Sequence, residues 1–416
     1  MRGLLRSKAG VAGMALLLTL VVLGIIGPWI VPFPGAGAHW HDIGYWQDSP
    51  AAAPPVWTNA FRRGDPAAVT AVLLPGAAVE TGLDNGARML SWDFTVAEAK
   101  GRALPDMILR IRGAGTLPVI VERIDTAGTA GARELFHALV DLSLGQDARI
   151  SLPASSRPGE SGMVVYRVRT LRLPAQAAPP APSILVRGQV SGLLGTDAAK
   201  RDIFTGLVLG IRWALLLGVL ASFLTVLTGM AFGIIAGCLR GVPDAIISRL
   251  YEFFYLMPVL PFLIVVSTVY RPSLWSFFLL IILFFWTRIF KPIYAMALQI
   301  REELYIEAAR SLGARRWRVL SRHVFPTLLP YGLAVMALSV PGIIVYEASV
   351  SLLGLGDTST VTWGQMLHEA LTQGAVINRL WWWVLPPGLA IALTGLSFAL
   401  LGIALERALR PRSRGL

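Results

Sequence analysis

The sequence predicts an all-α polytopic membrane protein with six transmembrane helices and a β-rich extracytoplasmic domain inserted between helices 1 and 2. The 416 residues are 55% hydrophobic, and the apolar residues gather in six runs without Asp, Glu, Lys or Arg. A helix needs about 20 apolar residues to cross the hydrocarbon core of a bilayer. The six runs are Ala9–His41, Trp213–Leu239, Phe253–Tyr270, Pro272–Thr287, His323–Tyr346 and Leu380–Leu405. As buried helices of a soluble protein, they would leave too few polar faces to meet water.

The distribution of basic residues predicts the orientation of the chain in the membrane. With the N-terminus inside and six crossings, the inner segments hold 17 Lys and Arg, whereas the two short outer loops hold only Arg271 and Arg379. This asymmetry is the positive-inside bias of plasma (inner) membrane proteins. It predicts a multi-pass protein with both termini in the cytoplasm and residues ~40–200 outside. Topology thereby explains the net charge of +12, and no nucleic-acid partner is needed.

The first apolar run has the features of an anchor and some features of a cleaved signal. Basic residues precede it, and Ala36-Gly37-Ala38 resembles a signal-peptidase cleavage site. The apolar stretch Val11–Val31 is longer than the roughly 7–15 residues of a secretory core segment, and it contains Pro28. We therefore expect residues 1–38 to form an N-terminal tail and a retained first helix.

Residues 39–195 differ in character and predict the β-rich domain. Polar and apolar residues alternate with the period of half-buried strands in Ser91–Val96, Leu109–Arg112 and Tyr166–Arg169. Turn residues separate these stretches, at Asp84–Gly86, Gly113–Gly115 and Pro158–Gly159. We expect one short helix at Glu134–Leu144 and Pro-rich linkers at Ala51–Pro55 and Pro174–Pro182. Because Cys238 is the only cysteine, this domain must fold without an intrachain disulfide.

Two histidines near the start of this domain are weak candidates for a metal site. His39 and His41 would lie on one side of a strand and could share an ion. Two ligands without visible partners make a poor site, and Trp40 and Trp46 beside them are typical of the membrane interface. We therefore predict no metal site and interpret the segment as interfacial.

Two features within the predicted spans are candidates for specific roles. Gly229, Gly233 and Gly237 form a doubled G-x-x-x-G pattern in the second span, which lets another helix approach closely but names no partner. Glu347 stands near the outer end of the fifth span, and an ionisable group at that depth is a functional candidate. Two alternatives remain for Glu347: part of an outer gate, or a structural hydrogen bond to a neighbouring loop.

The inner segment between the fourth and fifth spans carries the most informative pattern. Glu302–Leu312 is rich in helix-forming residues, and Gly313 follows as a C-cap glycine would. A second helix is expected over Ala314–Val324, stopping at Pro326. One side of the first helix carries a stripe of apolar and small residues: Leu304, Ala308 and Leu312, with Tyr305 and Ala309 beside them. A solvated basic loop would explain the arginines of this segment but not the stripe.

This segment also carries a family resemblance. Glu307-Ala308-Ala309-x-x-x-Gly313, followed after nine residues by His323-x-Phe325-Pro326, resembles the EAA loop of ABC importer permeases. In that family the loop forms a coupling helix that docks into a cleft on the ATPase subunit. The resemblance implies contacts with the ATPase at Leu304, Tyr305, Glu307, Ala308, Ala309 and Gly313.

Further segments resemble the second, C-type permease of the dipeptide/oligopeptide/nickel branch. They are Leu194–Phe204, Glu347–Gly356 and Trp363–Leu367. The resemblance implies a type I ABC importer permease fold for residues 196–410, with the coupling loop at 301–326 and a cytoplasmic tail at 411–416. The chain departs from the branch at Lys200, where relatives usually have Gly, and in its enlarged outer domain.

The resemblance implies that this chain forms half of a translocation pore and imports a substrate delivered by a binding protein, with di- or oligopeptides favoured over nickel or another small solute. Implied partners are a second permease, two ATPase subunits or one fused pair, and an extracytoplasmic binding protein. ATP and Mg²⁺ would be held by the ATPase subunits, because this sequence lacks the G-x-x-x-x-G-K-[ST] pattern, so no cofactor and no enzymatic activity are expected of this chain.

Two other classes of protein fit the sequence less well. A membrane-anchored receptor or scaffold, active through its outer domain, would not need six spans and an EAA-like loop. A secondary transporter would need intramembrane Asp or Glu for ion coupling, and the predicted spans are nearly free of them.

Overall fold

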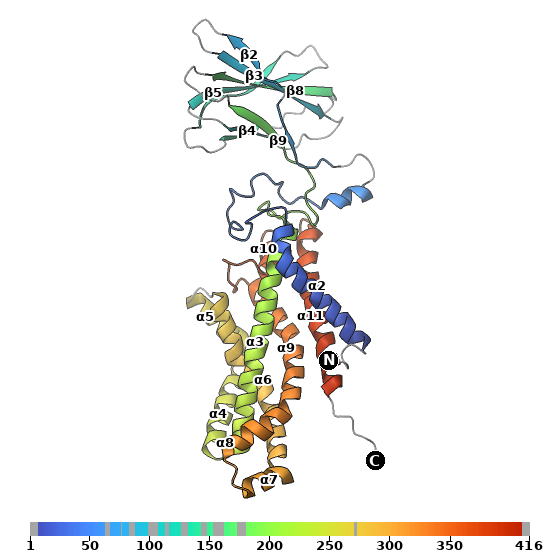
Figure 1. Ribbon diagram of the computed structural model, residues 1–416. Helices are drawn as coiled ribbons and strands as arrows, with labels where there is room; N and C mark the ends of the chain where they lie inside the picture. The colour runs from blue at the N-terminus through green and yellow to red at the C-terminus, as the bar shows by residue number, and fades with distance from the viewer. Residues whose placement is uncertain are drawn as a thin grey trace. The chain divides into compact units, whose positions relative to one another are not determined.

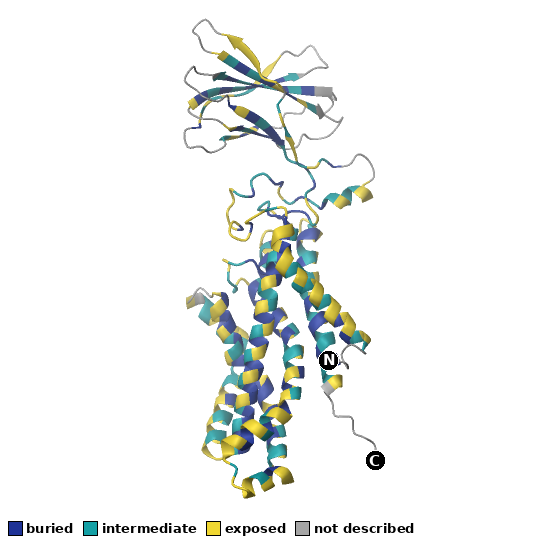
Figure 2. Ribbon diagram, viewed as in Figure 1, coloured by how far each residue is buried: buried dark blue, intermediate teal, exposed yellow. Residues whose placement is uncertain are grey.

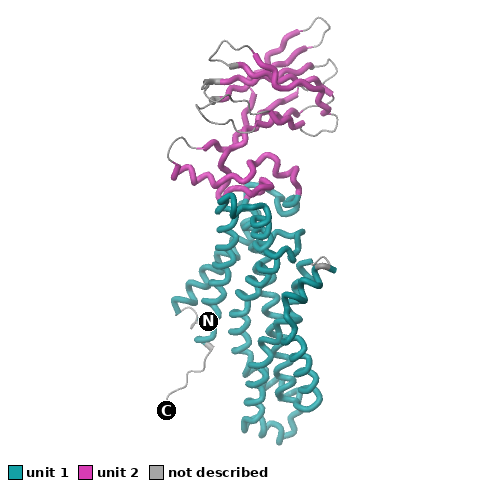
Figure 3. Tube along the Cα trace, turned by 180° about the vertical axis from the view of Figure 1, so that it is seen from behind, with its two compact units in different colours: residues 1–41, 203–416 teal, residues 42–202 magenta. Residues whose placement is uncertain are grey.

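The computed structural model describes residues 7–62, 67–75, 77–82, 88–98, 107–112, 116–125, 132–142, 148–152, 162–172, 180–269 and 273–409. They fall into two compact units, residues 1–41 with 203–416 and residues 42–202 (Figure 3). Several predicted features lie outside the described residues: the turns at 84–86, 113–115 and 158–159, most of the linker at 174–182, Arg271, and the tail at 411–416.

The unit of residues 42–202, called the outer unit after its predicted side of the membrane, is built from two antiparallel sheets (Figure 1). One sheet has the order β1 (Ala71–Leu73), β9 (Ala181–Val186), β4 (Met107–Arg112) and β7 (Ala148–Leu152). The other has the order β2 (Val79–Gly82), β3 (Arg88–Glu98), β8 (Gly162–Arg172), β5 (Thr116–Asp125) and β6 (Arg133–Asp141). A short 3₁₀ helix, η1 (Val56–Phe61), precedes the strands. The β-rich character predicted for this part of the chain is thus present.

Alternation of side chains explains why these segments form a sandwich. In the pairing of β3 with β8, Phe94 lies opposite Tyr166 and both rings are buried, whereas Asp93 lies opposite Arg167 on the outer face. Inward-facing residues of both sheets share one core cluster, so the sheets pack face to face. The predicted strand stretches at 91–96, 109–112 and 166–169 lie within β3, β4 and β8.

The short helix predicted at Glu134–Leu144 is wrong, because residues Arg133–Asp141 form the edge strand β6. The segment contains good helix formers, but β6 pairs with β5 along its length, and a register shift at Val121/Glu122 accommodates it. Leu135, Phe136 and Val140 pack on the sandwich core. Pairing and burial therefore override local helix propensity here.

Among the residues that the structure describes, the helical unit has five helices that are long and apolar enough to cross a membrane, or six if one bent pair counts as a single span. The described long helices are α2 (Lys8–Ile30), α3 (Ile203–Leu239), α6 (Leu274–Arg301), α9 (Phe325–Leu352) and α11 (Trp381–Leu409). The bent pair consists of α4 (Val242–Leu256) and α5 (Val259–Val269). Shorter elements are α7 (Leu304–Ser311), α8 (Arg316–Val319), the π-turn η2 (Leu320–Val324) and α10 (Trp363–Thr372).

The third predicted span, Phe253–Tyr270, is not one straight helix. The chain bends by 75° between α4 and α5. Met257, between them, has an extended backbone (φ −75°, ψ 122°). Pro258 follows it, and the residue before a proline is driven out of the helical region. The break is therefore a local consequence of the Met257-Pro258 dipeptide.

The fourth predicted span is correct in place but too short. The apolar run Pro272–Thr287 ends at Arg288, whereas helix α6 continues to Arg301. The charge pattern predicts that Arg288 and Lys291 belong to the inner loop. They lie instead inside a helix that is long and apolar enough to cross a membrane. Arg and Lys are good helix formers, so a charge marks the end of an apolar run without ending the helix.

Helix α3 packs against α6 through the predicted glycine stripe. A Cβ atom added at Gly229 would lie 2.8 Å from the Cβ of Ile289, and one at Gly233 would lie 2.7 Å from the Cγ2 of Ile293. At Gly237 the neighbour is the Cβ of Ala297, at 2.9 Å. The three contacts advance together along both helices, so α3 and α6 run parallel, and the absence of side chains at the glycines permits this close approach.

Candidate functional site

The first half of the coupling segment 301–326 forms a shorter helix than predicted. The expected helix Glu302–Leu312 is limited to α7, Leu304–Ser311. Glu302 closes the C-terminus of α6, and Glu303 is extended (φ −69°, ψ 138°) as the N-cap of α7. Leu312 is the C-cap. The segment is therefore a compact helix between two tight bends.

Gly313 ends α7 in the left-handed conformation, with φ +81°. The N–H of Gly313 donates to the carbonyl of Arg310 at 2.9 Å, and the N–H of Ala314 donates to the carbonyl of Ala309 at 3.0 Å. This pair of bonds is the Schellman arrangement, which favours glycine at its left-handed position. A Cβ atom at Gly313 would meet nothing within 4 Å, so only backbone conformation requires glycine here.

Helix α7 is mostly exposed (Figure 2), and Ile306 is its one buried residue. Ile306 is fully buried in a cluster with residues of α8 and η2. In contrast, Leu304 is 81% exposed and Leu312 is 89% exposed. The remaining predicted contact residues are exposed or half-buried on this helix: Tyr305, Glu307, Ala308 and Ala309. The predicted stripe therefore does not pack against the rest of this chain, and its side chains are accessible to a partner.

The second half of the segment does not stop at Pro326, so the predicted helix end is wrong. α8 runs into the π-turn η2 and then into α9, which begins at Phe325 and carries Pro326 in its first turn. Pro326 lacks the N–H that an α-helix would bond to the carbonyl of Arg322, and the helix widens into the π-turn just before it. The inner segment is thus continuous with the long helix α9.

Glu347 lies on α9 and is buried. Its carboxylate accepts a hydrogen bond from the Ser351 hydroxyl at 2.8 Å, and a second from Thr362, the N-cap of α10. Gly364 of α10 also packs closely on α9: a Cβ atom added there would lie 2.7 Å from the Cα of Ala348, the residue after Glu347. These contacts join α9 to the start of α10, which supports the structural alternative for Glu347 over the gate.

A buried ion pair closes the turn before α3. The Asp197 carboxylate accepts from the backbone N–H of Arg201 at 2.8 Å and from its Nε at 2.6 Å, and both residues are buried. Lys200, between them in sequence, has φ +70°. A left-handed backbone favours glycine, so the structure gives a physical reason for the Gly that the family resemblance leads us to expect at the position of Lys200.

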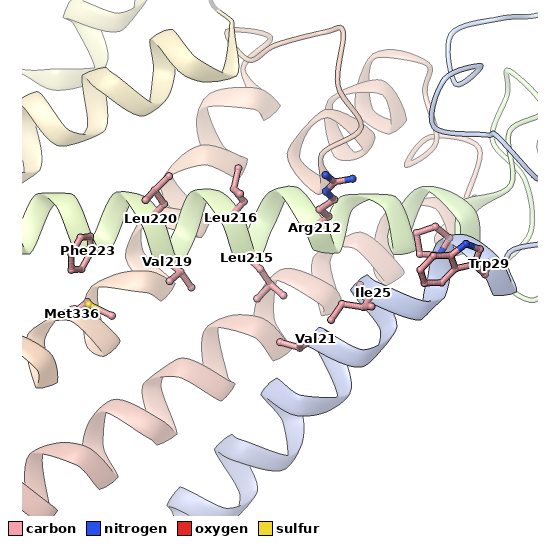
Figure 4. A pocket seen from close by; sticks show the side chains of 12 residues that line it. Val21, Ile25, Trp29, Arg212, Leu215, Leu216, Val219, Leu220, Phe223 and Met336 are labelled. Atoms are coloured by element: carbon pink, nitrogen blue, oxygen red, sulfur yellow. The ribbon is translucent and has the colours of Figure 1, made fainter. Parts of the chain in front are cut away.

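An apolar groove of about 840 Å³ lies between α2 and α3 (Figure 4). Leu215 and Val219 of α3 face Val21 and Ile25 of α2 across it, and Arg212 is the one charged residue among its lining residues. A peptide placed there would lose hydrogen bonds to water without replacement, at a cost of several kcal/mol (roughly 1–3 per group). This groove is therefore a poor transport path.

The sequence predicts no metal site, because His39 and His41 have no further ligand beside them. Within the described ranges, no three His, Cys, Asp or Glu side chains come together as metal ligands would. His39 and His41 lie in an irregular segment of turns rather than on a strand.

Comparison with known proteins identifies two family models along the chain. Residues 229–415 match the family described as binding-protein-dependent transport system inner membrane component. Residues 1–55 match the N-terminal transmembrane domain of oligopeptide transport permease C. The outer unit beyond residue 55 lies between the two matched regions.

Several curated proteins are similar over 53% of this chain. The dipeptide transport system permease protein DppC of Bacillus subtilis is 31% identical over 221 residues, which cover 68% of that protein. The oligopeptide transport system permease protein OppC of Haemophilus influenzae is 29% identical, with 70% of it covered. The glutathione transport system permease protein GsiD of Pectobacterium atrosepticum is 30% identical, with 72% of it covered.

Proposed function

The chain belongs to the inner-membrane permease family of binding-protein-dependent ABC importers, and on that premise we propose that it is the C-type permease of a di- or oligopeptide importer. It forms half of the translocation pore together with a second permease subunit. Two ATPase subunits, or one fused pair, supply the energy, and an extracytoplasmic binding protein delivers the substrate. Nickel or another small solute is the alternative cargo.

The outward stripe of α7 is the observation that carries this proposal. An eight-residue helix that exposes Leu304, Leu312 and a small residue at Ala308 buries little of its own apolar surface. Such a surface is suited to a partner's cleft, because the small side chain admits a close approach while the leucines supply apolar contact area. Tyr305, Glu307 and Ala309 complete the contact, and Gly313 sets the direction in which the chain leaves it.

Coupling then follows from the continuity of the inner segment. α7 is joined through α8 and η2 to α9, and Ile306 packs with Val319, Leu320 and Val324 in one cluster. Closure of the ATPase pair, which holds ATP and Mg²⁺, would draw the two coupling helices together and move the attached spans. The pore would thereby pass between inward- and outward-facing states, a two-state equilibrium biased by the ligand on the ATPases.

In the membrane we propose six crossings in a type I importer arrangement, with α4 and α5 together forming the bent crossing. Both termini and the coupling segment lie in the cytoplasm, and the β-sandwich lies outside, as the distribution of Lys and Arg predicts. In a Cys238→Ser background, single cysteines in the sandwich should react with impermeant thiol reagents added to intact cells. Cysteines at 300–322 should not react, and their labelling from outside would contradict this orientation.

The outer sandwich has two proposed roles of equal standing. It is either a docking or lid element for the binding protein, or a structural collar of the permease. Deletion of residues 56–190 separates these roles: a docking element predicts an assembled complex that has lost uptake, whereas a collar predicts loss of the assembled complex.

Ala308→Trp and Gly313→Val test the coupling role. Both variants should reach the membrane at normal abundance, because position 308 is exposed and the backbone strain of a Val at 313, where φ is +81°, is confined to the exposed end of α7. Both should weaken co-purification of the ATPase subunits and abolish peptide uptake, while the matched control Ala308→Ser keeps both. Normal uptake by Ala308→Trp and Gly313→Val would show that α7 is not the coupling element.

A further inference from the structure

Two cations lie deep within the helical unit. Arg288 and Lys291 belong to α6, which packs in parallel with α3 so that Ile289 faces Gly229. Arg288 is therefore level with about residue 228 of α3. At ~1.5 Å per residue it lies ~18 Å from the level of Arg240 and ~24 Å from that of Arg212, the charges that flank the apolar part of α3. Because the hydrocarbon core is about 30 Å thick, Arg288 lies near its middle.

The Arg288 side chain does not reach back toward the inner face. Its guanidinium carbon lies 4.5 Å from the ring centroid of Phe285, which is one turn closer to the outer end of α6. A basic side chain that snorkels to the inner interface would extend in the opposite direction. Arg288 therefore places its charge at membrane depth.

The exposed residues of α6 change character along the helix. In the outer half the exposed residues are Trp275, Ser276, Leu279 and Leu283, of which three are large and apolar. In the inner half the exposed residues are Arg288, Lys291, Pro292, Ala295 and Gln299. At ~100° per residue these five span an arc of roughly 100°, and the arc points about 160° away from the outer-half set. Charged side chains at this depth face water or protein rather than lipid, so the inner arc is not a lipid surface.

Aromatic rings lie beside both cations. The Phe285 ring beneath Arg288 contacts Tyr346 of α9, with centroids 4.9 Å apart. The Tyr346 hydroxyl is buried and has no hydrogen-bond partner among the described residues. Lys291 lies 4.9 Å from the ring of Tyr251 on α4 and 5.7 Å from that of Tyr294. Cations beside aromatic rings can hold a carboxylate while the rings pack against side chains of the same ligand.

We propose that the arc Arg288, Lys291, Ala295 and Gln299 lines the translocation path, and that Arg288 contacts the carboxylate of the passing peptide. This inference rests on the function proposed above and deepens it. The free carboxylate is common to ordinary peptides of any sequence, so one arginine at this depth gives attraction without selecting a sequence.

Water accessibility tests the first half of this proposal. In a Cys238→Ser background, single cysteines are placed at 288, 291 and 295, with matched controls at 279 and 283 on the apolar arc of the same helix. The assembled importer, in membrane fragments open to both faces, is treated with a charged methanethiosulfonate reagent. Labelling at 288, 291 and 295 should be at least roughly tenfold faster than at the controls, because lipid excludes a charged reagent. Labelling at 288 no faster than at 283 would overturn the proposal, and so would labelling at 288 only when the second permease is absent.

Uptake tests the second half. Arg288→Gln should lower peptide uptake roughly tenfold, as expected for loss of one charge-assisted contact, whereas Arg288→Lys should keep most of it. Co-purification of the ATPase subunits should be normal in both variants, since the residue lies far along α6 from the coupling segment. Wild-type uptake by Arg288→Gln would overturn this role alone. If the wild-type importer itself moved no peptide, the proposed function would fail instead.

Discussion

The β-sandwich and helix α7 differ in where they place their apolar side chains. Tyr166 and Phe94 are 0% and 2% exposed within the sandwich core, whereas Leu304 of α7 and its C-cap Leu312 are 81% and 89% exposed. The sandwich completes a hydrophobic core from its own two sheets. Helix α7 buries Ile306 and leaves its larger apolar side chains exposed. Burial therefore separates a region with a closed core of its own from one with exposed apolar side chains, which is the pattern expected of a contact with another subunit.

One alanine substitution in each region tests this difference most strongly, because the two substitutions should have very different effects on stability. Phe94→Ala should lower the free energy of unfolding of the outer unit by about 3–5 kcal/mol, because it leaves a cavity in a closed core. Leu304→Ala should change the protein's stability by less than about 0.5 kcal/mol, because its side chain meets solvent in the free chain.

Denaturation of the excised unit 42–202, followed by circular dichroism, measures the first effect, and thermal unfolding of the purified chain measures the second. The excised unit should show a sheet-dominated spectrum. A mainly helical spectrum, or equal destabilisation by the two substitutions, would remove the contrast between the regions.

A smaller effect is expected at the turn that leads from the outer unit into α3. Lys200→Gly should raise the thermal stability of the outer unit by about 0.5–1 kcal/mol, because glycine adopts φ +70° without the strain of a side chain. Ala198→Gly in the same turn is the matched control and should lower stability, since Ala198 does not have a positive φ. Destabilisation by both changes would show that contacts of the Lys200 side chain outweigh its backbone strain.

The smallest expected effect concerns the pH dependence of the sandwich surface. The hydrogen bonds from Arg167, at 2.7 and 2.8 Å, lower the pKa of Asp93 below its ordinary value of 3.8. A lowered pKa means that the ionised pair stabilises the folded state above pH 3.8, and that this contribution is lost as the pH falls through the lowered pKa.

The stability difference between wild type and Asp93→Asn should therefore be constant from neutral pH down to about 4 and should close at lower pH. Because both side chains are partly exposed, the difference should be small. Thermal unfolding of the outer unit across this pH range measures it. A difference that grows in acid would contradict the sign of the pKa change.

Local patterns in the sequence predicted the elements that depend on local physics. The bend at Gly313 and the exposed stripe on α7 follow from one glycine and a helical spacing of small and apolar residues. The strands around Trp92 and Val168 follow from period-two alternation. The resemblance that named the coupling residues rests on the same short segment.

Other elements depend on contacts that are distant in sequence, and the predictions there were wrong. β6 was predicted as a helix because its pairing with β5 is not visible in its composition. The helix beyond Thr287 was missed because a charge was taken as the end of a span, whereas packing against α3 continues the helix to Arg301. The break before Pro258 had a visible signal, since a proline there disfavours a helical residue at 257.

Site-specific photo-crosslinking tests the coupling role of α7 most directly. p-Benzoylphenylalanine is placed at position 304 or 312, with position 389 on α11 as an exposed apolar control, and the assembled importer is irradiated in native membranes. Positions 304 and 312 should crosslink to an ATPase subunit, and position 389 should not. Absence of an ATPase crosslink from both 304 and 312, at normal abundance of all subunits, would contradict the assignment of α7 as the coupling helix.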